Sequence, residues 1–178
     1  MAYSARQELQ LMNNELMFSS KNQKWQTRDE YFLPWQERFN FTLDVCASDG
    51  DQKCEKYFNP EQDGLKQDWT KDIFWCNPEY NREQIKWVQY GVKQKAKGVF
   101  LLPSRTDTKL FHDWLKPHCK IEFIKGRLIF GSDEYWSWLW DQEFVDDGKG
   151  GMKENPMYQK YGKMNAAPFP SLLAILNF

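Results

Sequence analysis

The sequence predicts an α/β fold with a mostly parallel sheet and helices on both faces. Short apolar segments alternate along the chain with segments whose apolar residues recur at helical spacing. Residues 98–103 (GVFLLP) are apolar throughout, as expected for a strand buried on both faces. With 178 residues, 41% of them hydrophobic, the chain is long enough to fold as one compact domain around such a sheet.

Seven segments are predicted as strands because each is short and apolar and lies between polar or turn-forming residues. They are residues 41–47, 54–58, 73–76, 98–103, 120–124, 127–130 and 171–178. Several of these strands are separated by segments with helical periodicity. This order favours parallel pairing, because a parallel connection must cross over the sheet and usually does so as a helix.

Three segments are predicted as helices, at residues 27–39, 81–97 and 108–115, because their apolar residues fall on one face. The faces consist of Tyr31, Phe32 and Trp35, then Ile85, Val88, Val92 and Ala96, then Leu110, Phe111, Trp114 and Leu115. Pro34 must kink the first of these helices or begin a new segment. Residues 1–24 are predicted to be a polar arm, and residues 25–178 a single domain with an irregular insert at about 131–165.

The net charge is −1, so the chain as a whole lacks the basic signature of many nucleic-acid-binding proteins. The charge is nevertheless uneven. Residues 82–127 hold eleven Lys or Arg against four acids, whereas residues 132–154 hold seven acids against two Lys. A basic side facing a polyanion and ordinary solvated helix faces both explain this asymmetry.

The four cysteines form no C-x-x-C pair, and neither histidine lies at a ligand spacing from a cysteine pair, so the sequence predicts no zinc site. No apolar run approaches the roughly 20 residues of a transmembrane helix, and the first residues have no signal-peptide pattern. We therefore expect a cytoplasmic protein with reduced thiols.

The segment Asn77-Pro78-Glu79-Tyr80 follows a predicted strand and precedes a predicted helix. The Asn77 amide oxygen is a hydrogen-bond acceptor, and Pro78 has a fixed φ that can direct its carbonyl outward. Two acceptors suit an amino group with two hydrogens, and Tyr80 offers a ring for stacking. Such a site would bind a base's exocyclic amine and direct its lone pair at an electrophile, which a sulfonium methyl donor would supply. An Asn-Pro turn with a buried tyrosine is the structural alternative.

Polar side chains also follow other predicted strands. Asp44 ends the first strand, Asp68 precedes the third, and Asn77 follows it. Because ligands of open α/β sheets bind at the carboxyl ends of the strands, we expect these side chains to converge on one site. Asp44 and Asp68 could instead cap local turns.

Seven segments together resemble the phage-type DNA N6-adenine methyltransferases, a Dam-like family of the Rossmann-like, S-adenosylmethionine-dependent class. They are W-x-T at 25–27, FTLDVCAS at 41–48, DGLKQDW at 63–69, FWCNPEY at 74–80, LLPSRTDT-x-x-FH at 101–112, IKGRLIF at 124–130 and APFPS at 167–171. The resemblance covers about residues 25–178. It implies a Rossmann-like sheet and methyl transfer from S-adenosylmethionine to the N6 amine of adenine in DNA, after base flipping.

The resemblance also implies roles for individual residues. The catalytic residues would be Asn77, Pro78 and Tyr80, with Tyr80 stacking on the adenine. The cofactor-binding residues would be Trp25, Thr27, Asp44, Ala47, Asp68 and Asn77. The DNA-binding residues would be Arg105, Thr106, Asp107, Lys125 and Arg127. Arg105 with Asp107 could also be a local ion pair, and Lys125 with Arg127 could serve only to hold a hairpin.

The sequence departs from the family pattern at Glu79, where a second proline is usual. The side chain at this position is not one of the two acceptors, so the chemistry does not require proline, but a carboxylate here repels a polyanion and should reduce or abolish the rate. The glycine-rich donor loop is reduced to Ser48-Asp49-Gly50. About 29 residues separate Asp44 from Phe74, which leaves no room there for a target-recognition domain.

The remaining place for target recognition is residues 131–165, which are acidic and contain Trp136, Trp138 and Trp140. An acidic segment is unexpected for reading DNA, and packing on the core or contact with a host protein are the alternatives. A non-catalytic phage protein that binds DNA or a host protein, as in anti-restriction, is therefore the main alternative to a DNA methyltransferase. A methyltransferase acting on RNA adenine or on protein glutamine is a further alternative.

Overall fold

The structure is a computed structural model of the chain. It describes residues 26–48, 50–131, 144–146, 151–154 and 167–178. The predicted arm at 1–24, Trp25 and most of the predicted insert at 131–165 lie outside the described residues. Two short strands from that insert, β6 (Phe144–Asp146) and β7 (Met152–Glu154), pair antiparallel.

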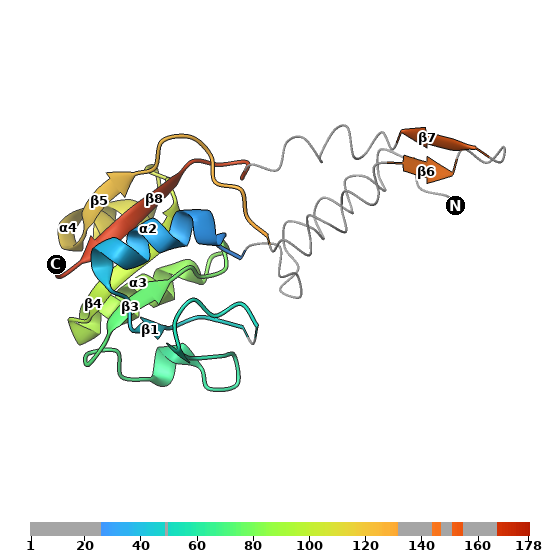
Figure 1. Cartoon of the computed structure of the whole chain (residues 1–178). Coiled ribbons are helices and arrows are strands. Elements are labelled where there is room, and N and C mark those ends of the chain that lie inside the picture. The colour runs from blue at the N-terminus through green and yellow to red at the C-terminus, as the bar shows by residue number, and fades with distance from the viewer. Residues whose placement is uncertain (1–25, 49, 132–143, 147–150, 155–166) are drawn as a thin grey trace, which may run out of the picture.

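A six-stranded sheet in the order β2-β1-β3-β4-β8-β5 forms the centre of the protein (Figure 1). The strands are β1 (Leu43–Asp44), β2 (Lys56–Tyr57), β3 (Ile73–Cys76), β4 (Lys97–Pro103), β5 (Lys120–Phe123) and β8 (Ser171–Leu176). The pairs β1–β2, β1–β3 and β3–β4 are parallel, whereas β8 runs antiparallel to both β4 and β5. The α/β class is confirmed, and the sheet is mixed.

Helices pack on both faces of this sheet. One face carries α2 (Asp29–Phe39), whose Phe32 and Phe39 join Trp75, Val99 and the alternate residues of β8 in one core cluster. The opposite cluster receives α3 (Gln84–Gln94) and the π-helical turn η3 (Leu110–Leu115), which continues into α4 (Lys116–His118). Helix α2 runs through Pro34 as one element, so no new segment begins there.

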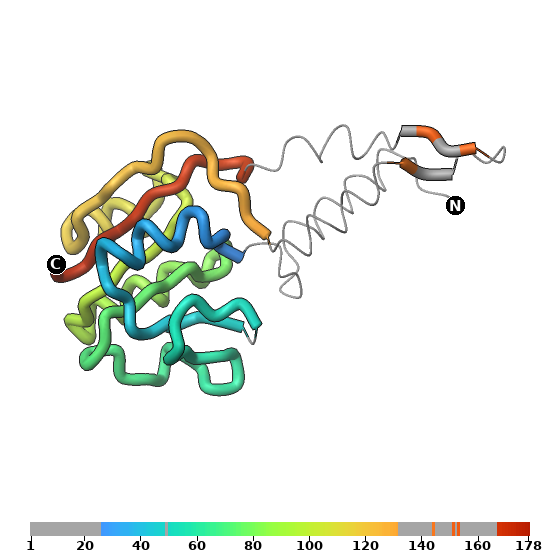
Figure 2. The backbone as a smooth tube through the Cα atoms, viewed as in Figure 1, coloured from blue at the N-terminus to red at the C-terminus, as the bar shows by residue number. Residues whose placement is uncertain are grey.

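The C-terminal strand returns into the sheet between two strands formed much earlier in the chain, as the red segment of Figure 2 traces. Every residue of β8 is buried, as expected for a central strand with a helix-covered face on each side. Among the described residues, no helix is long and apolar enough to span a membrane.

The prediction of a strand at 127–130 is wrong. Within the described residues it forms no strand: Ile129 and Phe130 are isolated bridge residues, and Phe130 pairs antiparallel with Thr27. Leu128 and Phe130 are buried in the cluster beside α2, so the alternation reflects burial on one face, and the pairing stays local and does not extend into a strand. The bridge matters for function, because it fixes Thr27 beside the carboxyl end of β3.

Candidate active site

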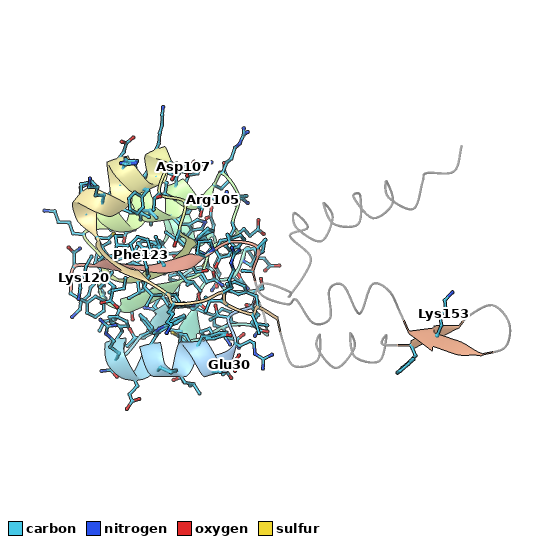
Figure 3. The ribbon with its side chains drawn as sticks, turned by 90° about the horizontal axis from the view of Figure 1, so that it is seen from above. Glu30, Arg105, Asp107, Lys120, Phe123 and Lys153 are labelled. Carbon is cyan, nitrogen blue, oxygen red and sulfur yellow. The ribbon has the colours of Figure 1, made fainter. Side chains whose placement is uncertain are left out.

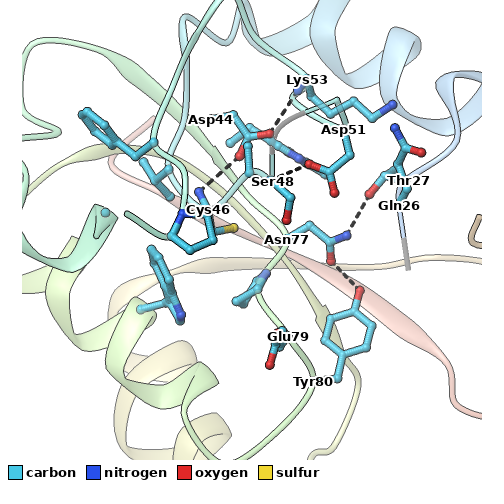
Figure 4. Close-up of a pocket in the computed structure, with 18 of the residues that line it drawn as sticks. Gln26, Thr27, Asp44, Cys46, Ser48, Asp51, Lys53, Asn77, Glu79 and Tyr80 are labelled. Atoms are coloured by element: carbon cyan, nitrogen blue, oxygen red, sulfur yellow. Dashed lines mark hydrogen bonds between the residues drawn. The ribbon is translucent and has the colours of Figure 1, made fainter. Parts of the chain in front are cut away.

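A cavity of about 470 Å³ lies at the carboxyl ends of β1 and β3 (Figure 4). From β1 the chain proceeds to β2 on one side, and it then returns to β3 on the other side of β1. Reversals of this kind leave a crevice where ligands of α/β sheets bind. Asp44 at the end of β1 and Ala47 after it line the cavity, and Asn77, Pro78 and Tyr80 line it after β3.

Hydrogen bonds hold the Asn77 side chain from two directions. Its Nδ2 donates to the Thr27 hydroxyl at 3.0 Å, and the Tyr80 hydroxyl donates to its Oδ1 at 2.7 Å. Thr27 is itself buried and fixed by the bridge to Phe130. The amide is therefore oriented by residues 50 positions before it and three positions after it.

The Tyr80 ring packs edge-on against two phenylalanines. Its centroid lies 5.8 Å from that of Phe130 and 5.2 Å from that of Phe169, with interplanar angles of 73° and 84°. Burial raises the pKa of Tyr80 well above its ordinary value, so the hydroxyl stays protonated and can donate to Asn77. Phe169 also lines the cavity, and the Arg105 guanidinium lies 6.0 Å from its ring centroid.

The Asp44 carboxylate both lines the cavity and organises the loop that follows β1. It accepts hydrogen bonds from the backbone N–H groups of Cys46 at 3.3 Å and Lys53 at 3.1 Å. Burial raises its pKa to about 6, although these two N–H groups act in the opposite direction. Asp44 is therefore a desolvated carboxyl group that titrates near the physiological range.

The structure places Asp68 outside the cavity. Asp68 is exposed, and its carboxylate accepts from the backbone N–H and the hydroxyl of Thr70, at 2.9 and 2.6 Å. These bonds describe the turn cap that the sequence left open as an alternative. The hydrogen bond from the Thr70 hydroxyl lowers the pKa of the Asp68 carboxyl most, and the bond from the Thr70 N–H lowers it further.

A different acid from the same DGLKQDW segment lines the cavity. Asp63 has a left-handed backbone (φ 52°), and its carboxylate accepts from the Leu65 N–H at 3.2 Å. The next residue must be glycine, because a Cβ on Gly64 would lie 2.0 Å from the Val45 carbonyl oxygen. The Trp69 indole donates to the Gly64 carbonyl at 2.8 Å, which pins this segment to the core.

Of the predicted DNA-binding residues, the cavity includes only Arg105. Arg105 and Asp107 lie near each other on the described surface, but no ion pair joins them (Figure 3). Thr106, Lys125 and Arg127 are exposed and do not line the cavity. Arg127 donates to the Ala167 carbonyl at 3.2 Å, which ties its loop to the segment before β8.

Glu79 is exposed at the cavity mouth and is held by its neighbour. Asn81 Nδ2 donates to the Glu79 carboxylate at 3.0 Å, and the Asn81 N–H donates to the Glu79 carbonyl at 2.8 Å. The Glu79 carboxylate therefore lies at an exposed part of the cavity lining and is oriented by its hydrogen bond from Asn81.

Sequence reasoning missed several residues that line the cavity. They include Gln26, Asp51, Lys53, Phe58, Asn59, Asp63 and Phe169. Phe58 and Asn59 follow the carboxyl end of β2, so the strand-end rule could have found them. Phe169 lies in the APFPS segment of the resemblance, but that segment assigned it no role, because only the pairing of β8 brings it next to Tyr80. Within the described residues, no group of three His, Cys, Asp or Glu could hold a metal ion.

Comparison with known proteins identifies the family. The family model of DNA N-6-adenine-methyltransferase (Dam) matches residues 16–152, more than half of the chain. The chain belongs to the Dam family. It is 28% identical over 130 residues to a DNA N-6-adenine-methyltransferase of Haemophilus phage HP1, covering 66% of this chain and 75% of the relative. It is 29% identical over 109 residues to a DNA N-6-adenine-methyltransferase of Escherichia phage T1, covering 58% of this chain and 45% of that relative.

The family assignment confirms the resemblance to phage Dam-like methyltransferases. The matched region includes Asp44, Asp63, Arg105 and the whole Asn77–Tyr80 segment, so most of the cavity comes from the shared part of the Dam chain. Phe169 and β8 lie beyond the matched region. The wall against which Tyr80 packs is therefore completed by a part of the chain that the family match does not reach.

Proposed function

We propose that this Dam-family chain transfers a methyl group from S-adenosylmethionine to the N6 amino group of adenine in DNA. The convergence of Asn77, Tyr80 and Asp44 on one cavity at a reversal of strand order carries this proposal. The phage relatives named as DNA N-6-adenine-methyltransferases support the same reaction. The sheet with its reversal between β1 and β3 supports a Rossmann-like assignment, and phage relatives favour action in the host cytoplasm.

The residues that line the cavity fit S-adenosylmethionine. The volume of about 470 Å³ falls within the range of roughly 300–1,000 Å³ typical of small-molecule sites. Asp44 is a buried carboxyl group that would be stabilised as an anion by the cationic amino group of the donor. Thr27, Ala47 and Asp63 would complete the donor site. When bound, S-adenosylmethionine supplies an electrophilic methyl group on a sulfonium.

Asn77 and Pro78 would prepare the amine of the target base. Asn77 Oδ1 and the Pro78 carbonyl each accept one N6 hydrogen, which draws these hydrogens out of the ring plane and directs the nitrogen lone pair towards the methyl group. A duplex adenine must first leave the base stack, and the Tyr80 ring compensates part of that cost by stacking on it. Arg105 at the mouth would contact a phosphate beside the extruded nucleotide.

A methyl-transfer assay tests the proposal. The purified chain is incubated with radiolabelled S-adenosylmethionine and, separately, with DNA, RNA and protein extract. We expect label in DNA as N6-methyladenine. Asn77→Ala should lower the rate by roughly 100- to 1,000-fold, the typical effect of removing one preorganised polar group. Asn40→Gly is the matched control, because Asn40 is an exposed amide at the end of α2 with φ 52°, which glycine adopts easily.

Two observations favour a second function. The fixed Glu79 carboxylate and the occupied Asn77 oxygen both oppose entry of a nucleotide. A protein that keeps the fold and the donor site but binds DNA or a host protein without catalysis would show donor binding and no label in any substrate. That outcome would exclude the methyltransferase proposal, whereas label in RNA or protein would redirect it to a different amine.

A further inference from the structure

Two thiols meet directly beneath the candidate active site. Cys76 ends β3 immediately before Asn77, and Cys46 follows the end of β1. Their sulfur atoms are 3.6 Å apart, and the Cys46 thiol donates to the Cys76 sulfur. The sulfurs are thus in van der Waals contact, and a disulfide would require an approach of about 1.5 Å more, to an S–S length of about 2.05 Å.

The strand register, continued by one residue, places Val45 opposite Cys76, so Cys46 reaches Cys76 diagonally from the chain that leaves β1. Leu43 pairs with Phe74 and Asp44 with Trp75 in parallel register, and the Val45 N–H extends the ladder by donating to the Trp75 carbonyl at 3.1 Å. Cys46 lies one residue beyond that bond, on a chain that is leaving the strand. Adjacent strands lie about 4.7–4.9 Å apart, so diagonal neighbours such as Cys46 and Cys76 are somewhat farther apart than this, still compatible with the Cα separations of about 4.4–6.8 Å found across disulfides.

Only one of the two thiols is accessible from the cavity. Cys46 lines the cavity, whereas Cys76 is completely buried in the core behind it. A small oxidant that enters the cavity would therefore react at Cys46, and Cys76 would be the adjacent resolving thiol. Cys54 belongs to the core cluster on the other face of the sheet, so it is not part of this pair.

We propose that Cys46 and Cys76 form a site of reversible covalent modification, in which a peroxide oxidises them to a disulfide that disables the cavity. The Cys46 sulfur attacks one peroxide oxygen, which gives a sulfenic acid and releases one water from hydrogen peroxide. The Cys76 sulfur then attacks the Cys46 sulfur and forms the S–S bond. The sulfenic oxygen leaves with the Cys76 proton as a second water, so two thiols and one peroxide give one disulfide and two waters.

The disulfide would displace groups on both sides of the cavity. The Cys46 N–H donates to the Asp44 carboxylate, and Cys76 is covalently bonded to Asn77. The hydrogen bond to Cys76 and burial raise the pKa of Cys46 well above its ordinary value, and burial also raises the pKa of Cys76. Both thiols are therefore protonated at neutral pH, and the reaction should be slow and need sustained peroxide.

Oxidation of the reduced full chain with hydrogen peroxide tests the site. Remaining thiols are alkylated, and a non-reducing digest is examined by mass spectrometry. We expect one cross-linked peptide pair that joins Cys46 to Cys76 and has lost two hydrogen atoms. Dithiothreitol should reverse the cross-link. The double variant Cys54→Ala, Cys119→Ala should form the same cross-link, because neither of these cysteines belongs to the pair.

The effect on the cavity is measured in two ways. Binding of S-adenosylhomocysteine and methyl transfer should fall on cross-linking, the latter by about 100-fold, as expected for a displacement of the order of 1 Å. Hydrogen exchange at residues 44–54 and 76–81 should change as well, and this readout does not depend on the proposed reaction. Cys76→Ala, or Cys76→Ser if the first variant unfolds, should give no cross-link.

Two results would overturn the proposal. The first is oxidation of Cys46 to sulfinic acid with no bond to Cys76. The second is a cross-linked protein whose hydrogen exchange and ligand affinity equal those of the reduced protein. If the reduced protein shows no methyl transfer, only the proposed function is contradicted. The cross-link and hydrogen exchange would still test the proposed thiol site, because neither measurement depends on methyl transfer.

Discussion

The Tyr80 hydroxyl donates to Asn77 Oδ1 at 2.7 Å, so it occupies the acceptor that the proposed reaction assigns to the target amine. A carbonyl oxygen has two lone pairs, which allows the hydroxyl and an amine to share it or one to replace the other. The Thr27 bond to Asn77 Nδ2 keeps the amide orientation in either case. The hydroxyl and the ring of Tyr80 therefore have opposite expected effects on catalysis.

Tyr80→Phe should keep or increase the rate of methyl transfer, because it removes the competing hydroxyl and retains the ring. A net hydrogen bond of about 0.5–1.5 kcal/mol limits any gain to roughly 2- to 10-fold. Tyr80→Ala should weaken DNA-dependent catalysis by about 1–3 kcal/mol through loss of stacking. Single-turnover rates at saturating donor separate the two variants. Equal losses in both would show that the hydroxyl itself is required.

Glu79→Gln should lower the KM for DNA by roughly 2- to 5-fold at low salt, since it removes a fixed negative charge at the mouth. The gain should shrink as salt screens the charge. Glu79→Pro removes the same charge and also stiffens the turn, so a larger effect on kcat in this variant would separate the two causes. Glu37→Gln, an exposed change on α2 away from the cavity, is the matched control. An equal response in that variant would exclude a local effect.

The parts of the fold that the sequence predicted best are buried on both sides. Residues 73–76 were predicted as a strand and form β3 with the same bounds, and residues 98–103 form β4 with one added residue. Helices pack on both faces of these two strands, so neither strand has a polar face that would interrupt its apolar sequence. The prediction of a strand at residues 127–130 was wrong, because alternate residues are buried against α2 while the backbone pairs only at isolated bridge positions.

The candidate site was predictable where a residue follows its own strand. Asp44 and Asn77 were found in this way, and the structure brings both to the cavity. The choice between Asp63 and Asp68 was not predictable, because the two acids lie in one segment and local turn geometry decides which faces the cavity. Phe169 depends on a strand pairing with β4 that no local pattern encodes.

Asp63 and Asp68 provide a matched test of the donor site. Asp63→Asn should weaken S-adenosylhomocysteine binding, by about tenfold if one charge-assisted hydrogen bond of roughly 1.5 kcal/mol is lost. Asp68→Asn should leave the affinity unchanged, because this side chain caps the turn at Thr70 outside the cavity. Isothermal titration calorimetry measures both. The reverse order of effects would restore Asp68 as the donor contact.

Asp44 predicts how donor binding depends on pH. Its pKa of about 6 lies within the accessible range, and only its ionised form attracts a cationic amino group. Affinity for S-adenosylhomocysteine should therefore be constant above about pH 7 and fall as the pH drops through 6. Asp44→Asn should bind more weakly and lose this dependence. Wild-type affinity that does not change between pH 5 and 7.5 would show that Asp44 does not contact the cationic amino group of the ligand.

The same residue predicts the sign of a stability change. Because burial raises the folded-state pKa of Asp44 above its ordinary 3.8, the folded protein holds a proton between about pH 4 and 6 that the unfolded chain releases. The contribution of Asp44 to the free energy of unfolding is therefore present below pH 4 and lost as the pH rises through 6. A shift of about two pKa units corresponds to roughly 3 kcal/mol. Urea unfolding of wild type and Asp44→Asn across pH 4–8 measures the two free energies of unfolding. As the pH rises, that of the wild type should fall relative to that of the variant. A difference that is independent of pH would mean that the carboxyl group is solvated in the folded state.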